Sequence, residues 1–425
     1  MYVLYAVLVH IAFVLVLPLL LLHPKLRSGF RFRLGRMPPG WPGERALRSP
    51  RIWLHGASAG DVLALQPIIT QLRKELPDCG IVLTVVTRTG FEVARNLPGV
   101  DAWGYLPFDL PWTVRRFVRA LRPDVLVLEY AEIWPALLRA VKRSGARVVL
   151  TNGHFDERAL SRYRFFYRLI GNPLVHLDRL CMREPVEARR ALAIGAPAER
   201  ILVTGNTKFD RCRELMDEDG RAVDALRESL GLDPDGLLWV AGSTHRGEEE
   251  ILLGIFTALR AKHAGLRLLI APRYPERAGE VQRLAKRVGL AAALRSAGAG
   301  DAPVIVLDSI GELASAYRMA SVVFVGGSFV RRGGQNILEP AACGRAVLFG
   351  PYMHNFADSV RLLLGRGGIQ VADGDQLGTT LDELLARPEV LEQLGQTARR
   401  AVAAVQGASR ADARVIAGLA LGARR

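Results

Sequence analysis

Short apolar runs alternate with helix-like stretches along the chain from residue 51 onward. The runs are continuously apolar rather than alternating, which is typical of parallel strands that are covered on both faces. The alternation of strands and helices predicts a doubly wound α/β domain in the first half of the chain. Its strands are expected at residues 51–55, 81–86, 124–130, 147–151, 181–183 and 201–205.

A second series of apolar runs follows a charged stretch that ends in the turn-forming sequence GLDPDG. The chain has 425 residues, which is too many for one ordinary core. We therefore expect an α/β protein with two Rossmann-like domains that face each other across a cleft and bind ligands beyond the carboxyl ends of their strands. The second series of strands is expected at 237–241, 266–271, 304–307, 321–326 and 346–350. The predicted parts are a first domain at 24–210, a linker at 211–236, a second domain at 237–395 and a helical segment at 396–425.

The N-terminus carries no formal charge over 21 residues, from Tyr2 to Leu22. This length spans a bilayer core of about 30 Å, so it predicts a single-pass anchor at residues 1–23. A basic flank follows, and the positive-inside rule places it and the rest of the chain in the cytoplasm. The flank contains Glu44 as its one acidic residue and the basic residues Lys25, Arg27, Arg31, Arg33, Arg36, Arg45, Arg48 and Arg51. A helix lying in the membrane interface remains an alternative, because Pro18 can bend it. A cleaved signal peptide is not expected, because this segment lacks the basic start and the small-residue cleavage site of such peptides.

The charge balance favours anionic partners. The chain has 57 Lys and Arg residues against 42 Asp and Glu residues, a formal net charge of +15. Phosphates, nucleic acid and an acidic membrane surface all fit this excess, but no recognised nucleic-acid motif is present, so we do not expect nucleic acid. Residues 158–168 mix arginines with aromatic residues, which suits an anionic lipid surface or a phosphorylated lipid. An ordinary amphipathic helix with a solvated arginine face fits that segment equally well.

Cysteine and histidine spacings argue against a metal site. The four cysteines contain no Cys-x-x-Cys pair, and the eight histidines contain no His-x-x-x-His spacing. The scattered cysteines also argue against a disulfide framework and fit a reducing compartment. We therefore expect neither a metal nor a cofactor.

The first βα turn, residues 55–61, reads HGASAGD. Its small residues let a helix begin close to a ligand, and Asp61 falls in the first turn of that helix, at the mouth of the expected cleft. Asp61 is equally well interpreted as a helix-start carboxylate that the helix dipole favours. The same turn matches Gly-x-Ser-x-Gly, which leaves a hydrolase with Ser58 as nucleophile as an alternative.

Two further candidates follow later strands of the first half. Glu129 ends a very apolar strand, where a charge is costly unless it has a partner or a function. Lys208 follows another strand end, in the sequence GNTKFD. If the sheet is parallel, both strand ends lie on the same side of the domain. The alternatives are a helix-capping role for Glu129 or its neighbour Glu132, and an ordinary linker lysine at position 208.

The second half offers three segments for an anionic nucleotide. Arg273 follows a strand after Pro272 and has the fork-shaped cation that suits a phosphate. Residues 311–313 open a helix, and residues 326–340 run from a strand through a glycine-rich basic loop into another helix. In that helix Asn336 and Glu339 share one face, where a carboxylate can hold ribose hydroxyls. Neither G-x-G-x-x-G nor a Walker sequence is present.

The motifs, taken in order, resemble those of the Kdo transferases of Gram-negative bacteria, which move 3-deoxy-D-manno-octulosonic acid (Kdo) from CMP-Kdo to a lipid A precursor. The resemblance extends from the N-terminal anchor to beyond residue 360. It implies a glycosyltransferase fold of the B type, an N-terminal acceptor domain, a C-terminal CMP domain, an inverting and metal-independent reaction, and a place at the bacterial inner membrane. The matching segments are HGASAGDV, TRTGFEVA, YLPFDLP, EYAEIWP, GNTKFD, AGSTHRGEEE, PRYPER, DSIGEL, FVGGSFVRRGGQNILEP and GPYMHNF.

The resemblance also implies roles for individual residues. Asp61 falls at the catalytic base, and Glu129 and Lys208 fall at transition-state stabilisers. The implied CMP contacts are Pro272, Arg273, Gly311, Glu312, Leu313, Asn336, Ile337, Leu338 and Glu339.

Departures from the family pattern mark a divergent member. Asp61 replaces the usual Glu, Gln335 replaces the usual His, and Arg246 replaces the usual Glu of STHEGE. Tyr274 and Tyr352 also stand where the family usually has His, and the usual NARLS-like segment reads NGHFD at 152–156. The CMP contacts are kept while groups around the sugar and the acceptor change. This combination allows an altered sugar or acceptor, and it keeps open a catalytically weakened paralogue that binds a nucleotide sugar or a lipid.

Overall fold

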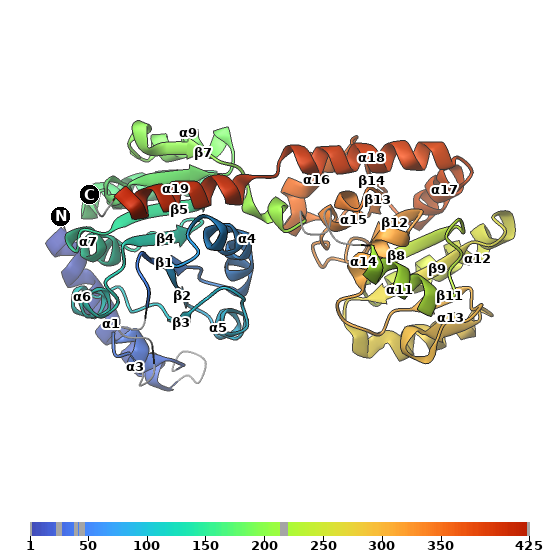
Figure 1. The fold of residues 1–425 in the computed structure, drawn as a ribbon, viewed down its shortest axis with the longest axis horizontal. Coiled ribbons are helices and arrows are strands. Elements are labelled where there is room, and N and C mark those ends of the chain that lie inside the picture. Colours follow the sequence, from blue (N-terminus) through green and yellow to red (C-terminus); the bar gives the residue numbers. More distant parts are fainter. Residues whose placement is uncertain (1, 23–27, 38–40, 42–46, 213–219, 423–425) are drawn as a thin grey trace. The chain divides into compact units, whose positions relative to one another are not determined.

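The computed structural model describes residues 2–22, 28–37, 41, 47–212 and 220–422. The chain divides into two compact units, of which unit 1 comprises Met1–Arg211 and Gln406–Arg425 and unit 2 comprises Cys212–Val405. Each unit contains one parallel sheet of seven strands with helices between the strands, which confirms the predicted pair of α/β domains (Figure 1). Lys25, Arg27, Glu44 and Arg45 of the basic flank lie outside the described residues, as do 213–219 of the predicted linker.

The sheet of unit 1 has the strand order β3-β2-β1-β4-β5-β6-β7. Its strands are β1 (Arg51–His55), β2 (Gly80–Val85), β3 (Ala102–Tyr105), β4 (Val125–Glu129), β5 (Arg147–Gly153), β6 (Arg179–Met182) and β7 (Ile201–Val203). The central strands are fully buried, which explains their continuous apolar sequences. The order reverses direction between β1 and β4, so their carboxyl ends, at His55 and Glu129, form the switch point where such sheets bind ligands.

Helices connect these strands. They are α4 (Ala59–Glu75), α5 (Arg88–Arg95), α6 (Pro111–Leu121), α7 (Pro135–Arg143), α8 (Leu160–Ile170) and α9 (Pro185–Ala193), and a short 3-10 segment, η4 (Thr207–Cys212), follows β7. The C-terminal helix α19 (Ala408–Gly422) returns to unit 1 and packs against α4, β4 and β5. Asp210 holds the start of this return, because its carboxylate accepts the backbone N–H groups of Gly407 at 2.6 Å and Ser409 at 2.5 Å.

Two N-terminal helices complete unit 1, α1 (Tyr2–Leu22) and α3 (Phe30–Arg33). The hydroxyl of Tyr5 on α1 donates to the Asp109 carboxylate at 2.5 Å, and Asp109 also accepts the first backbone N–H groups of α7. Further along α1, the ring of Phe13 lies 5.3 Å from that of Phe108. One side of α1 therefore packs on unit 1, while much of its surface is exposed and apolar.

The sheet of unit 2 has the strand order β10-β11-β9-β8-β12-β13-β14. Its strands are β8 (Leu238–Thr244), β9 (Arg267–Pro272), β10 (Ala292–Leu294), β11 (Val304–Val306), β12 (Val322–Val325), β13 (Ala346–Phe349) and β14 (Gly368–Gln370). Its helices are α11 (Arg221–Ser229), α12 (Glu248–Lys262), α13 (Ala278–Arg287), α14 (Leu313–Met319), α15 (Leu338–Ala342), α16 (Ala357–Leu363), α17 (Gly374–Leu385) and α18 (Pro388–Ala404). The switch point of this sheet lies between the carboxyl ends of β8 and β12.

Candidate functional site

Asp61 lies at the switch point of unit 1, in the first turn of α4. Ser58 is the N-cap residue of α4, and its hydroxyl oxygen accepts the Asp61 N–H at 3.4 Å. In return, Asp61 Oδ2 accepts the backbone N–H of Ser58 at 2.8 Å and its hydroxyl at 2.9 Å. Both of these bonds end on one oxygen, and the side chain is partly exposed. Asp61 thus has the helix-start role considered from the sequence, with Oδ1 outside this capping box.

Among the residues that the structure describes, no histidine forms a hydrogen bond with the Ser58 hydroxyl. A serine nucleophile needs a neighbouring imidazole to take its proton, whereas Ser58 donates to a carboxylate. The nearby His55 is buried, with Nδ1 2.9 Å from the Thr84 carbonyl oxygen and Nε2 3.7 Å from Glu132 Oε2. The geometry of the described residues therefore leaves the hydrolase alternative without support.

Glu129 is fully buried at the end of β4. Its carboxyl oxygens accept the Thr151 hydroxyl at 2.8 Å and the Asn152 amide at 2.9 Å. Burial nevertheless dominates, and together with the smaller effects of the charges of Asp412 on α19 and of Asp61 it raises the pKa of Glu129 to about 8. A carboxyl group with this pKa is mostly protonated at neutral pH, so it can donate a hydrogen bond at the switch point.

Lys208 lies in η4, on the same side of the sheet. Its Nζ is 5.1 Å from the centroid of the Tyr130 ring, and Tyr130 directly follows Glu129. Tyr130 has a φ of 59°, a left-handed conformation that a non-glycine residue adopts only when its surroundings hold it there. Unit 1 therefore brings Lys208, Glu129 and Asp61 to the carboxyl edge of one sheet.

Glu248, which sequence reasoning missed, organises the switch point of unit 2. Its buried carboxylate accepts the backbone N–H groups of Gly327 at 2.7 Å, Ser328 at 3.0 Å and Phe329 at 2.9 Å, and that of His245 at 2.9 Å. Four charge-assisted bonds thus hold the start of the glycine-rich loop against the end of β8. The available signal was a run of three glutamates, 248–250, that begins a helix shortly after a strand.

Cations gather beside this loop. Arg273 follows β9, and its backbone N–H donates to the Thr244 carbonyl oxygen at 2.9 Å. Burial lowers the pKa of His245, and the positive charges of Arg332, Arg273 and Arg277 lower it as well, against the opposing charge of Glu249. The carboxyl edge of the second sheet is therefore a positive environment that suits a phosphate.

The remaining CMP candidates also follow strand ends of unit 2. Glu312 precedes α14 and pairs with Arg295 through two contacts of 2.8 Å, so this carboxylate already has a cationic partner. The Asn336 amide donates to Glu339 Oε1 at 2.9 Å, while Asn336 Oδ1 accepts the Leu338 N–H at 3.0 Å. Asn336 therefore both accepts the first backbone N–H of α15 and orients Glu339. No group of metal-ligating side chains that could hold an ion occurs within the described part of the chain.

Comparisons with known proteins identify the family of this chain. Residues 28–211 match the family model described as 3-deoxy-D-manno-octulosonic-acid transferase. The 3-deoxy-D-manno-octulosonic acid transferase of Haemophilus influenzae is 32% identical over 363 residues, which cover 84% of this chain and 84% of that protein. The protein of the same name from Bordetella pertussis is 33% identical over 408 residues and covers 90% of this chain and 91% of its own length.

A solved structure supports the fold separately. The glycosyltransferase from Rickettsia africae matches with a TM-score of 0.56 at 11% identity, over 87% of this chain and 98% of that one. At such low identity the match concerns the two-domain fold alone. The sequence relatives carry the family assignment, because their identity extends over most of both chains. The chain belongs to the 3-deoxy-D-manno-octulosonic acid transferase family of glycosyltransferases.

Proposed function

We propose that this protein transfers Kdo, or a related sugar acid, from its CMP-activated form to a lipid A precursor in lipopolysaccharide biosynthesis. The observation that carries the proposal is the Asp61 carboxylate, which lies at the ligand-binding edge of unit 1 with one oxygen outside its capping box. An attacking hydroxyl must lose a proton, and a positioned carboxylate can accept it. Direct displacement of CMP by that hydroxyl inverts the anomeric centre and needs no metal.

Two other groups of unit 1 support the displacement. A protonated Glu129 adds no negative charge at the switch point, and Lys208 supplies a positive charge as negative charge develops. On the donor side, Arg273 and Arg332 provide preorganised positive charge for the departing CMP phosphate. Pro272, residues 311–313 and residues 336–339 stay the proposed contacts for the rest of the nucleotide.

A second function is a nucleotide-sugar or lipid binding protein with weakened catalysis. Two observations favour it. Asp61 Oδ2 already accepts hydrogen bonds from Ser58, and Gln335 replaces a histidine of the family pattern, with its Nε2 3.5 Å from His245 Nε2. Restoring both family residues, with Asp61→Glu and Gln335→His in one protein, then creates activity that the natural chain lacks. If the natural chain is already active, this alternative fails.

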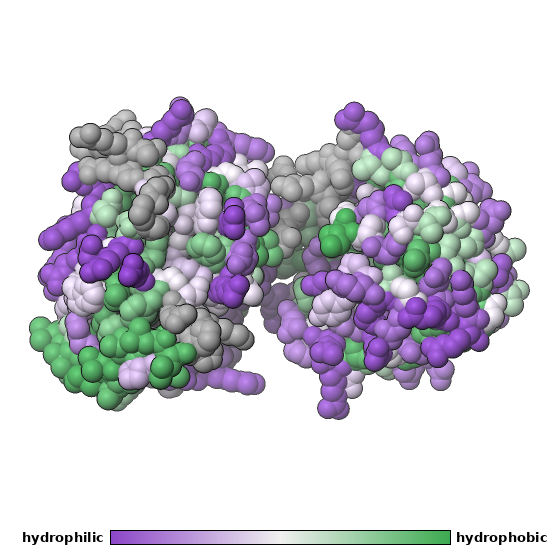
Figure 2. Space-filling view, turned by 90° about the horizontal axis from the view of Figure 1, so that it is seen from below, coloured by the Kyte–Doolittle hydropathy of each residue, from purple (hydrophilic) through white to green (hydrophobic). Residues whose placement is uncertain are grey.

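Membrane attachment through α1 fits a lipid acceptor. Among the described residues, α1 is the one helix long and apolar enough to cross a bilayer, and Figure 2 shows apolar surface gathered on one side of unit 1. We propose attachment to the bacterial inner membrane with both units on the cytoplasmic side. The length and charge of α1 favour a single membrane span. The contacts of its N-terminal end favour instead a helix along the interface, because the Arg139 guanidinium lies 4.1 Å from the centroid of the Tyr2 ring and Tyr5 bonds to Asp109.

The test of the proposed reaction is incubation of the purified full chain with CMP-Kdo and a lipid A precursor, followed by mass spectrometry of the lipid. The proposal predicts a mass increase equal to whole Kdo residues. An unchanged lipid, in the presence of measurable CMP binding, supports the binding-protein alternative and contradicts the transferase.

A further inference from the structure

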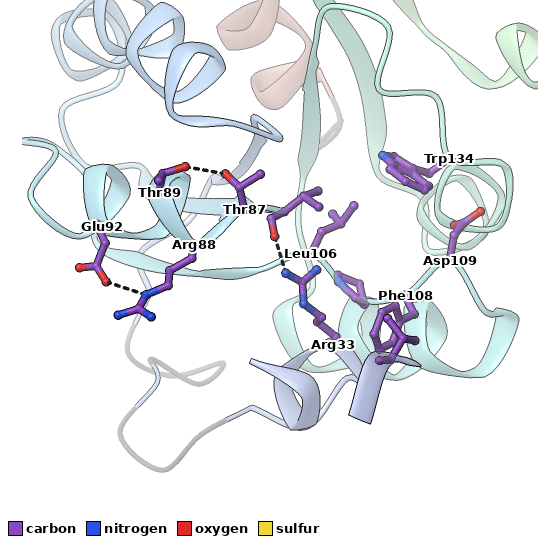
Figure 3. Close-up of a pocket in the computed structure, with 12 residues that line it drawn as sticks. Arg33, Thr87, Arg88, Thr89, Glu92, Leu106, Phe108, Asp109 and Trp134 are labelled. Carbon is purple, nitrogen blue, oxygen red and sulfur yellow. Dashed lines mark hydrogen bonds and ion pairs between the residues drawn. The ribbon is translucent and has the colours of Figure 1, made fainter. Parts of the chain in front are cut away.

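A pocket of about 900 Å³ lies within unit 1 (Figure 3). This volume falls within the range of about 300–1,000 Å³ that is usual for ligand sites. Its walls come from α1, α3 and α5, from the segments after β2 and β3, and from the N-cap of α7. The apolar wall residues are Leu20, Val86, Leu106, Pro107, Phe108 and Trp134. The pocket is therefore mainly apolar, and the membrane-attachment helix forms one of its walls.

Both sides of the pocket connect to the turn that carries Asp61. On one side, the backbone N–H groups of Val86 and Thr87 donate to the Ala57 carbonyl oxygen at 3.0 Å each. On the other side, the indole N–H of Trp134 donates to Glu132 at 3.0 Å, and Glu132 lies 3.7 Å from His55. A ligand in the pocket therefore lies beside the backbone that positions the proposed base.

Arg33 is a buried cation in the pocket wall, whose other polar and charged residues are Thr87, Arg88, Thr89, Glu92 and Asp109. It is 8% exposed, and its guanidinium donates to the carbonyl oxygens of Ser28 and Val86 and lies 4.5 Å from the centroid of the Tyr105 ring. In the parts of the chain that the structure describes, no carboxylate pairs with it. The neighbouring Asp109 is already bound to Tyr5 and to two backbone N–H groups of α7.

An unpaired buried charge is costly, so the site favours an anion. Arg33 and the apolar walls line one cavity, and the guanidinium in Figure 3 lies among the wall residues. A ligand with a long apolar part and an anionic group satisfies both features at once. A free phosphate leaves the apolar volume empty, and an uncharged hydrocarbon leaves Arg33 unpaired.

We propose that the pocket holds an acyl chain of the glycolipid acceptor and that Arg33 pairs with a phosphate of its head group. The inference rests on the proposed transfer to a lipid A precursor, and it names the part of that acceptor which unit 1 recognises. Guanidinium and phosphate form bidentate, charge-assisted hydrogen bonds, which fix the orientation of a head group. The bound chain holds the sugar of the acceptor near Asp61.

The first test uses the full chain, CMP-Kdo and water-soluble phosphorylated acceptor analogues that carry one short acyl chain of increasing length. KM is expected to fall about fourfold for each added methylene until the pocket is full, with little change in kcat. A KM that does not depend on chain length overturns the inference. Failure to transfer to any acceptor, acylated or deacylated, counts instead against the proposed function.

The second test fills the pocket. Thr89 is exposed and lines it, so Thr89→Trp adds bulk without disturbing a buried core. This variant is expected to raise KM for the acylated analogue by at least about tenfold, which corresponds to displacing fewer than two methylenes from the pocket. The KM for the deacylated analogue is expected to stay the same. Thr379→Trp, at an exposed threonine of unit 2, is the matched control and is expected to change neither. An equal loss for both analogues, or a loss of binding to phospholipid vesicles with an unchanged acceptor KM, contradicts the inference.

The third test addresses the charge. Wild-type protein is expected to prefer the phosphorylated analogue over its dephosphorylated form, and Arg33→Gln is expected to abolish that preference. Arg31→Gln, an exposed position on the same helix, removes the same charge outside the pocket and is expected to retain the preference. An Arg33→Gln protein that still discriminates overturns the pairing. If that variant does not fold, Thr89→Trp and the chain-length series decide.

Discussion

Replacing Glu248 by Gln is expected to loosen the glycine-rich loop of unit 2. Each carboxylate oxygen accepts two backbone N–H groups: Oε2 accepts those of His245 and Gly327, and Oε1 those of Ser328 and Phe329. A glutamine keeps one oxygen and places an NH₂ group against the other two donors. Two buried N–H groups then lose their acceptor.

The size of the effect follows from those two groups. An unsatisfied buried donor costs about 1–3 kcal/mol, so Glu248→Gln is expected to destabilise unit 2 by about 2–6 kcal/mol, with local relaxation lowering the observed value. Thermal unfolding measures this loss, and calorimetry with CMP measures its effect on the proposed nucleotide site. CMP affinity is expected to fall as well, because the same loop leads to Asn336 and Glu339.

Glu250→Gln is the matched control for this prediction. Glu250 lies on the first turn of the same helix and is exposed, and it accepts one backbone N–H, that of Gly247, at 3.2 Å. Its replacement is expected to change the free energy of unfolding by less than about 1 kcal/mol. Equal Tm values for Glu248→Gln and the wild type, or equal losses for both variants, refute the reasoning.

Three further changes test other parts of the structure. The pKa of Glu129 is about 8, above the usual 4.5 of a glutamate, so the folded state binds an extra proton and the free energy of unfolding falls as pH rises towards 8. Glu129→Gln is therefore expected to flatten the fall of Tm between about pH 5 and 8, and an unchanged slope contradicts the raised pKa. A Cβ added at Gly242 lies 2.0 Å from the hydroxyl of the buried Tyr317, so Gly242→Ala is expected to destabilise unit 2 by about 1–3 kcal/mol in denaturant unfolding, whereas Gly254→Ala, where nothing lies within 4 Å, is not. Phe165 on α8 is 71% exposed among arginines, so Phe165→Ser is expected to weaken cosedimentation with anionic vesicles, and equal binding by both proteins means that α8 does not contact the membrane.

The central strands of both sheets could be predicted because each is a continuous apolar run. Trp53 in β1 and Trp239 in β8 are both fully buried, as covered parallel strands require. Three strands could not be predicted: β3, β10 and β14, with the sequences AWGY, AAL and GIQ. All three lie at sheet edges, where a strand is short and has a neighbour on one side alone. Glycine interrupts the apolar pattern in AWGY and GIQ, and AAL is only three residues long.

Some residues of the candidate site could be predicted from the sequence and others could not. Asp61, Glu129 and Lys208 could be selected because each follows a strand, and parallel strands end at one edge. The functions of Glu248 and Arg33 depend on contacts that sequence spacing does not reveal. Glu248 binds a loop 79 residues further along the chain, and Arg33 looks like one more member of a basic flank until its burial is known.

The role of Asp61 is the central claim, and single-turnover transfer by Asp61→Asn tests it most directly. The asparagine side chain can keep the capping contacts of α4 but cannot accept a proton, so the account predicts that transfer from CMP-Kdo is lost while the Kd for CMP is unchanged. Asp375→Asn, at a first-turn aspartate of α17, controls for the loss of a helix-start charge and is expected to remain active. Wild-type rates of transfer by Asp61→Asn contradict the account.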